Sequence, residues 1–135
     1  MLIASLQVEQ NLPNHFKILS DIFEDLPFEP DFVVPYPFTK LVVNMGVQTQ
    51  GHTDPKDNDL CVVVPFGEWK GGELCLYQPG VVLELQPGDM VAFPSNRIAH
   101  FNLEMSGLRG SLVMATDVSV NTWKETRNYW KHAVH

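Results

Sequence analysis

The chain is poor in cysteine, in basic residues and in long hydrophobic runs. Its 135 residues include two cysteines, and nine Lys and Arg against sixteen Asp and Glu, which gives a net charge of −7 and a pI near 5.0. Such a charge argues against a phosphate-binding surface over most of the domain. The chain also lacks low-complexity tracts, internal repeats and any segment long enough to span a bilayer. We therefore expect an ordinary globular protein without a membrane partner.

The first ten residues lack the basic region and the small-residue cleavage site of a signal peptide. This absence predicts an intracellular location, in the cytoplasm or the nucleus. Cys61 and Cys75 fall on separate predicted strands and could in principle meet. Because nothing suggests export, we interpret them as buried free thiols rather than as a disulfide.

The length allows one sizeable core but not two, which predicts a single domain over residues 1–135. Pro13 and Asn14 introduce a predicted helix, whose apolar residues recur at helical spacing as far as Leu26. Four prolines then forbid regular helix up to Phe38. A closing helix is predicted over residues 121–132, with aromatic side chains that pack on a sheet: Trp123, Tyr129 and Trp130.

From Lys40 onward the pattern changes to short strand-like runs separated by Gly and Pro turns. The predicted strands are residues 41–45, 60–65, 73–77, 81–86, 90–94, 99–105 and 109–116. Many short strands of this kind indicate a sandwich or barrel. The expected fold is mainly β, with an N-terminal helix, a C-terminal helix and a core of about residues 40–117.

A short motif, His52-Thr53-Asp54, carries the strongest chemical signal. Its His and Asp lie two residues apart, so on an extended segment both side chains point the same way. A third ligand must come from a strand distant in sequence, and His100 follows the apolar run that ends at Pro94. Two imidazoles and one carboxylate on one face of a metal leave positions open, as in non-haem Fe(II) oxygenases.

Arg109 and Ser111 follow His100 on the last predicted strand, on one face of it. A guanidinium offers a planar, permanently charged fork to a carboxylate, and the Ser hydroxyl is a further donor. The spacing therefore predicts a metal site with an anchor for a keto acid. Each feature alone also has a plain interpretation: a solvated turn for the motif, a core histidine for His100, and a surface ion pair for Arg109.

Taken together, these residues resemble the double-stranded β-helix of Fe(II)/2-oxoglutarate dioxygenases over Leu41 to Asp117, more than half of the chain. The matching segments are His52-Thr53-Asp54, Gly71-Gly72-Glu73-Leu74, residues 84–89, His100 and Arg109-Gly110-Ser111. Within that superfamily, Val43-Asn44-Met45-Gly46 and the hairpin that leads to Pro87-Gly88-Asp89 look most like compact fungal members of the branch with the TET and J-base thymidine oxygenases.

The resemblance implies a jelly-roll, cupin-like fold in which His52, Asp54 and His100 bind Fe(II). Arg109 would pair with the distal carboxylate of 2-oxoglutarate, helped by Ser111, and O₂ would complete the reaction that hydroxylates a C–H bond. Many prolyl-hydroxylase-type relatives have a Tyr on the first core strand, where this chain has Asn44. Asn44 is therefore either a cosubstrate ligand or a turn former.

Three flanking features have two interpretations each. The run Asp57-Asn58-Asp59 could orient a metal ligand, but an exposed turn is expected. Phe66 and Trp69 could stack on a planar base, but they are expected to cap the sheet. A C-terminal basic cluster could form a local patch or a solvated helix face, and the helix face is expected: Lys124, Arg127, Lys131 and His132.

Three functions follow from these patterns. The favoured one is an oxygenase, with a 5-methylpyrimidine base in nucleic acid as the substrate that the branch suggests. The acidic balance keeps peptide substrates, as in prolyl hydroxylases, and small molecules open. The second function is a cupin-like module that binds metal or ligand without turnover, and the third is a structural domain with an accidental motif. A homodimer is one of the assemblies that the sequence leaves open.

Overall fold

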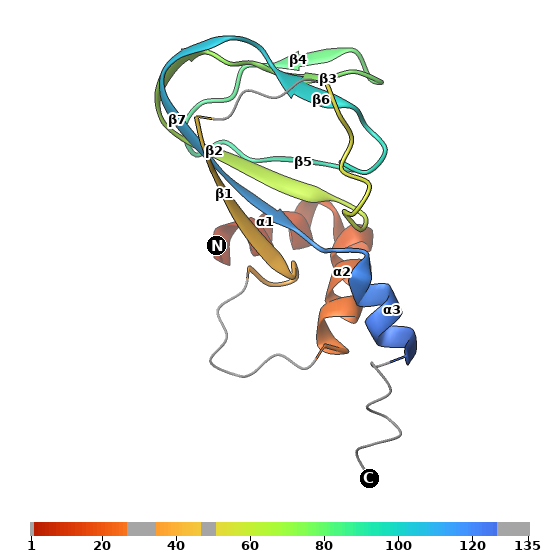
Figure 1. Ribbon diagram of the computed structural model, residues 1–135. Helices are drawn as coiled ribbons and strands as arrows, with labels where there is room; N and C mark the ends of the chain where they lie inside the picture. Colours follow the sequence, from red (N-terminus) through yellow and green to blue (C-terminus); the bar gives the residue numbers. More distant parts are fainter. Residues whose placement is uncertain (1, 27–34, 47–50, 127–135) are drawn as a thin grey trace.

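The structure, a computed structural model, describes residues 2–26, 35–46 and 51–126 (Figure 1). Two helices, α1 (Leu2–Asn11) and α2 (Pro13–Glu24), precede the strands, and α3 (Ser119–Thr126) follows them. The strands are β1 (Lys40–Met45), β2 (Cys61–Gly71), β3 (Leu74–Leu76), β4 (Val81–Leu83), β5 (Val91–Phe93), β6 (His100–Asn102) and β7 (Met105–Ala115). In the described part of the chain, no helix is long and apolar enough to cross a membrane.

The strands form two antiparallel sheets that lie one above the other (Figure 1). Sheet A has the order β1-β7-β2-β5, and sheet B has the order β4-β3-β6. Neighbours in each sheet are mostly not consecutive in the chain, because the chain crosses repeatedly from one sheet to the other. The predicted fold, a mainly β double-stranded β-helix with helices at both ends, is confirmed.

The long strand β7 fixes the register of sheet A. It pairs with β1 on one side and with β2 on the other, so that Ser111 lies opposite Asn44 and Pro65. Because side chains alternate across a strand, Arg109, Ser111 and Val113 share the face toward sheet B. The opposite face of the sheet carries Val62 and Met114 against the helices.

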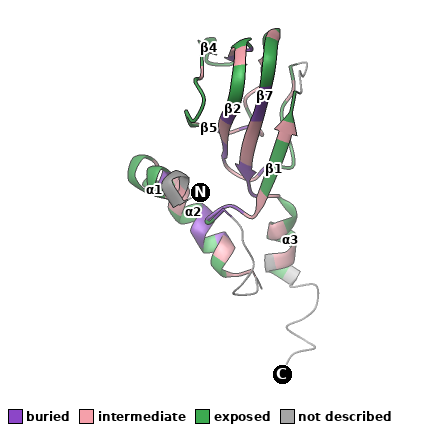
Figure 2. Ribbon diagram, turned by 90° about the vertical axis from the view of Figure 1, so that its left-hand side faces the viewer, coloured by how far each residue is buried: buried purple, intermediate pink, exposed green. Residues whose placement is uncertain are grey.

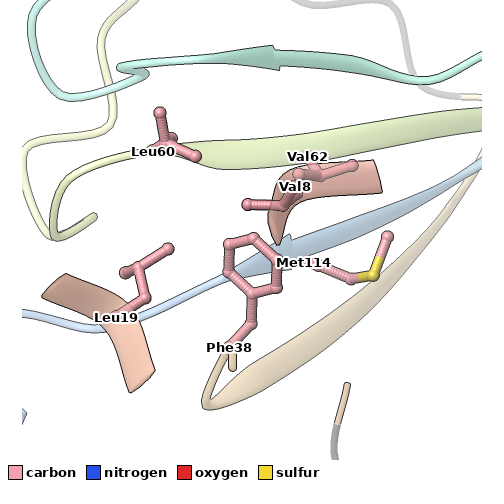
Figure 3. Close-up of a cluster of buried hydrophobic side chains, with 6 residues drawn as sticks. All are labelled: Val8, Leu19, Phe38, Leu60, Val62 and Met114. Atoms are coloured by element: carbon pink, nitrogen blue, oxygen red, sulfur yellow. The ribbon is translucent and has the colours of Figure 1, made fainter. Parts of the chain in front are cut away.

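The first hydrophobic core lies between sheet A and the helices. Six buried side chains from five segments of the chain point toward one another (Figure 3): Val8, Leu19, Phe38, Leu60, Val62 and Met114. Burial in β2 and β7 is strongest at the ends near α2, while the far part of β2 is exposed (Figure 2). The helices therefore anchor one end of the β-helix.

The second core lies between the sheets, around Cys61, Leu74 and Phe93. Cys61 and Cys75 are both buried and free, which confirms their interpretation as thiols. Burial raises the pKa of Cys61 from 9.0 to about 12, with the carboxylates of Asp57 and Asp54 acting in the same direction. Cys61 is therefore held as a neutral thiol in the folded protein.

Several elements differ from the sequence-based predictions. Helix α1 was not predicted, because its apolar residues do not gather on one face, although Val8 is buried against α2 and sheet A. β2 extends to Gly71, well past the predicted end at residue 65. α3 begins at Ser119, where the Asp117 carboxylate accepts a hydrogen bond from the Ser119 amide at 2.8 Å. Its predicted continuation, including most of the basic cluster, lies outside the described residues.

Candidate active site

His52 and His100 are brought together by a β-bridge at the edge of sheet B. The His52 amide donates to the His100 carbonyl at 3.2 Å, and the His100 amide donates to the His52 carbonyl at 2.9 Å. Directly paired residues present their side chains on the same face of a sheet. The two imidazole rings accordingly lie 4.5 Å apart between centroids.

Asp54 lies just beyond this bridge, where its backbone amide donates to the Ser95 carbonyl at 2.8 Å. Its carboxylate reaches both histidines, with 3.5 Å from Oδ1 to His52 Nε2 and 3.2 Å from Oδ2 to His100 Nε2. One ligand atom from each of the three residues lies within 4.8 Å of the others. The three predicted metal ligands therefore meet in one place.

The donor set fits a divalent first-row transition metal such as Fe(II). Imidazole nitrogen and carboxylate oxygen in a two-to-one ratio form the facial triad that leaves coordination positions open. His100 Nδ1 lies 2.9 Å from the Ile98 carbonyl oxygen, which can only accept. A proton donated from Nδ1 to that oxygen leaves the Nε2 lone pair facing the other two candidate ligands, where it can bind a metal.

Arg109 lies on β7 with only 9% of its surface exposed. Its Nη1 donates to the Gly72 carbonyl at 2.6 Å, and its guanidinium lies 5.9 Å from the centre of the Trp69 ring. Burial lowers the pKa of Arg109, but a guanidinium keeps its charge in proteins. Across residues 2–26, 35–46 and 51–126, no carboxylate lies within 4.0 Å of it. A buried cation without an acidic partner is suited to bind an anion.

Gly72, which lies between β2 and β3, packs directly against the Arg109 side chain. Gly72 has a φ of +68°, and a Cβ built on it would collide with Arg109 Nη1. Its amide donates to the Glu104 carbonyl at 2.9 Å, and its carbonyl also accepts from Asn102 Nδ2 at 3.2 Å. The turn therefore brings a backbone carbonyl against the guanidinium in a space that only glycine leaves free.

The three candidate metal ligands and Arg109 line one cavity of about 260 Å³ between the two sheets. All six residues predicted for the site line it: Asn44, His52, Asp54, His100, Arg109 and Ser111. Asn44 lies within β1, opposite Ser111, and so is part of a strand rather than a turn. Further walls are apolar, among them Val63, Phe93 and Val113.

One sequence-based expectation around the site was wrong. Asp57 was expected in an exposed turn, yet it is 5% exposed and lines the cavity. Trp69, which was expected to cap the sheet, lines the cavity beside Arg109. Phe66 does pack on the sheet, since a Cβ on Gly110 would collide with its ring.

Lys40 and Asn102 are cavity residues that the sequence did not single out. Asn102 could have been found, because it lies two residues after His100 and therefore on the same strand face. Lys40 could have been found in the same way, because it lies four residues before Asn44 on β1 and therefore on the same strand face.

No family model matches the chain. The curated proteins include thymine dioxygenase JBP1 of Leishmania tarentolae, which is 31% identical over 96 residues, or 69% of this chain and 11% of that protein. The solved structures include NgTET1 in complex with 5mC DNA, with a TM-score of 0.63 and 22% identity, covering 87% of this chain and 46% of that one.

This chain thus spans about a tenth of the curated relative and about half of the solved one. The resemblance to the branch that contains the TET and J-base thymidine oxygenases is confirmed by these two similarities. The likeness to NgTET1 concerns the fold, in which the two sheets enclose the site.

Proposed function

We propose that this chain is a non-haem Fe(II)/2-oxoglutarate-dependent dioxygenase that hydroxylates a C–H bond. His52, Asp54 and His100 hold the iron. Arg109 binds the distal carboxylate of 2-oxoglutarate, and Ser111 and Asn44 add polar contacts from the same sheet face. The observation that carries this proposal is one cavity that contains both a triad of metal-ligating side chains and a buried guanidinium with no acidic partner among the described residues.

The cavity has polar groups that can hold the metal and the keto acid, and apolar walls around them, which suits oxidation chemistry. When bound, iron and the keto acid would supply the oxidising power, as the substrate, 2-oxoglutarate and O₂ are converted to the hydroxylated substrate, succinate and CO₂. The residues of the chain position the reactants: Arg109 fixes the keto acid by a two-pronged contact, and the triad fixes the metal at the other end. The apolar walls, including Phe93 and Val113, keep water away from the reacting groups.

The best-supported substrate is a 5-methylpyrimidine base in nucleic acid. This choice comes from the relatives, since one is named a thymine dioxygenase and the other was solved with 5mC DNA. The net charge of −7 favours a short or single-stranded nucleic acid over a long duplex, because phosphates are repelled by an acidic surface. An intracellular location, in the cytoplasm or the nucleus, belongs to the same proposal.

The test is turnover by the purified protein with Fe(II), 2-oxoglutarate and O₂. Oligonucleotides that contain thymine or 5-methylcytosine are compared with the free nucleosides, a proline-containing peptide and a buffer blank. The proposal expects succinate and a hydroxymethylpyrimidine in equal amounts with a nucleic-acid substrate. Hydroxyproline together with succinate would assign the enzyme to peptides instead.

His100→Ala is the matched control, because it removes one metal ligand and leaves the anion anchor. It should release no succinate above the blank. If wild-type protein binds Fe(II) but yields no succinate with any substrate, the proposed enzymatic activity is overturned, and the chain is a metal-binding module. Equal succinate from wild type and His100→Ala would contradict the assigned site.

A further inference from the structure

Behind Asp54, three hydrogen bonds close a ring through Ser95 and Asp57. The Asp54 amide donates to the Ser95 carbonyl at 2.8 Å, and the Ser95 hydroxyl donates to Asp57 Oδ2 at 2.6 Å. The Asp57 amide then donates to the Asp54 carbonyl at 3.0 Å. The backbone of the metal-ligating aspartate is therefore held on both sides by the same two residues.

The ring is buried and tied to the rest of the fold. Ser95 is fully buried, and the Asp57 side chain is 7% exposed. The second carboxylate oxygen of Asp57 lies 3.0 Å from Lys40 Nζ, at the start of β1. Asp57 thus joins the loop that carries Asp54 to two other segments, the turn after β5 and the first strand of sheet A.

This support matters because Asp54 itself lies outside the strands. Its side chain is 41% exposed and contacts the two histidines, which are themselves metal ligands in the proposed function. A carboxylate on an irregular segment has no register to set its position, so its placement depends on such hydrogen bonds. Residues that orient metal ligands typically change metal affinity by about 10- to 100-fold when they are removed.

We propose that Asp57 is a positioning residue for the metal site, which acts on Asp54 through Ser95 and is itself held by Lys40. This proposal rests on the proposed function insofar as His52, Asp54 and His100 bind a metal. It adds a role for Asp57, whose interpretation from the sequence as part of an exposed turn was wrong. The carboxylate does not touch the metal in this role.

The test measures Co(II) affinity and the Co(II) absorption spectrum of the intact chain under anaerobic conditions. Asp57→Ala is expected to weaken Co(II) binding by about 10- to 100-fold. Asp57→Asn, which keeps an acceptor for the Ser95 hydroxyl but loses the charge that faces Lys40, should fall between wild type and Asp57→Ala. Ser95→Ala, which breaks the ring at its other member, should weaken binding in the same direction.

The matched control is Asp59→Asn, two residues further along the same loop. Asp59 contacts His15 at 2.7 Å and takes no part in the ring. Its φ of 66° is one that asparagine tolerates, so the substitution should fold and bind Co(II) like wild type.

A positioning role is separated from a merely structural one by the spectrum at saturating Co(II). Positioning predicts that the bands of Asp57→Ala differ from those of wild type even when every site is filled. Loss of stability alone would leave the bands of the folded protein unchanged, which would overturn the proposal. Unchanged Co(II) affinity with lost turnover would also overturn it, because Asp57 would then act on the substrate in the cavity.

The two proposals can fail separately. If wild-type protein binds neither Co(II) nor Fe(II), the proposed function fails and the positioning role fails with it. If wild type binds and Asp57→Ala, Asp57→Asn and Ser95→Ala all bind equally well, only the positioning role fails.

Discussion

The two ends of the cavity are built in different ways. Arg109 lies within β7, which pairs with β1 on one side and with β2 on the other. At the metal end, His100 begins a strand of three residues, His52 takes part in an isolated bridge, and Asp54 lies outside both. Sheet register therefore positions Arg109, the proposed anion anchor, whereas individual hydrogen bonds position the proposed metal ligands.

The same fold therefore places a strand residue, Arg109, and a loop residue, Asp54, by different means. A long paired strand sets side-chain direction over its whole length, so the anchor depends mainly on local space beside Gly72. A loop has no such constraint, and its ligand must be fixed by polar contacts such as those from Ser95. Each end should therefore respond to a different class of substitution.

The largest expected effect is at the metal end. His100→Ala removes one of three ligands and should lower metal affinity by more than the roughly 100-fold that the loss of an orienting residue can cost. Anaerobic Co(II) titration measures this, with circular dichroism as the check on folding. A folded variant that retained wild-type affinity would show that His100 is not a ligand. It would also contradict a metal site at this end of the cavity.

The next largest effect is at the anion end. Arg109→Ala should weaken 2-oxoglutarate binding to the metal-loaded protein by about 3 kcal/mol, roughly a hundredfold, because a buried charged contact is lost. Arg109→Lys keeps the charge without the planar fork, so its affinity for 2-oxoglutarate should fall between those of wild type and Arg109→Ala. Metal affinity without the keto acid should not change in either variant. If metal affinity fell equally, the two ends would not be independent.

A pair of glycine variants sharpens the same point. Gly72 and Gly80 have nearly equal φ values, +68° and +67°, but no atom lies within 4 Å of a Cβ built on Gly80. Gly72→Ala and Gly80→Ala should both lose about 1 to 3 kcal/mol of stability from backbone strain. Gly72→Ala should in addition bind 2-oxoglutarate about tenfold more weakly, or about 1.4 kcal/mol, by displacing Arg109. Equal keto-acid affinities would argue against that contact.

The effect that is smallest at neutral pH concerns Cys61, whose pKa is raised by burial to about 12. The folded state holds this proton more tightly than the unfolded state, so its contribution is complete below pH 9 and is lost as pH rises toward 12. Over that range it lowers the free energy of unfolding by up to about 1.4 kcal/mol per pH unit. Cys61→Ala should remove this part of the pH dependence in denaturant titrations. Identical slopes for the two proteins would show that the thiol ionises normally.

Much of the fold was predictable because alternation and turns are local signals. The strand segments follow from apolar runs between Gly and Pro, and α2 follows from its helical spacing. Helix α1 was missed because its apolar residues do not gather on one face, and the far half of β2 was missed because it is polar and exposed. The single domain with its core at about residues 40–117 stays a prediction, which limited proteolysis would test.

The residues that could bind the metal and the anion were predictable from the sequence, but the residues that hold them in position were not. His52, Asp54 and Arg109 belong to short motifs whose residue types imply metal and anion binding, and His100 follows an apolar run at the spacing of a third ligand. Asp57 looked like part of a polar turn, because its partners Lys40 and Ser95 are distant in sequence and meet it only through the pairing of segments in space.

The most direct measurement is an anaerobic Fe(II) titration with and without 2-oxoglutarate, monitored by visible absorption. Iron and keto acid bound together should give a charge-transfer band that neither gives alone, and that is absent in His100→Ala and much weaker in Arg109→Ala. No band from wild-type protein that demonstrably binds both iron and 2-oxoglutarate would contradict a shared site in this cavity.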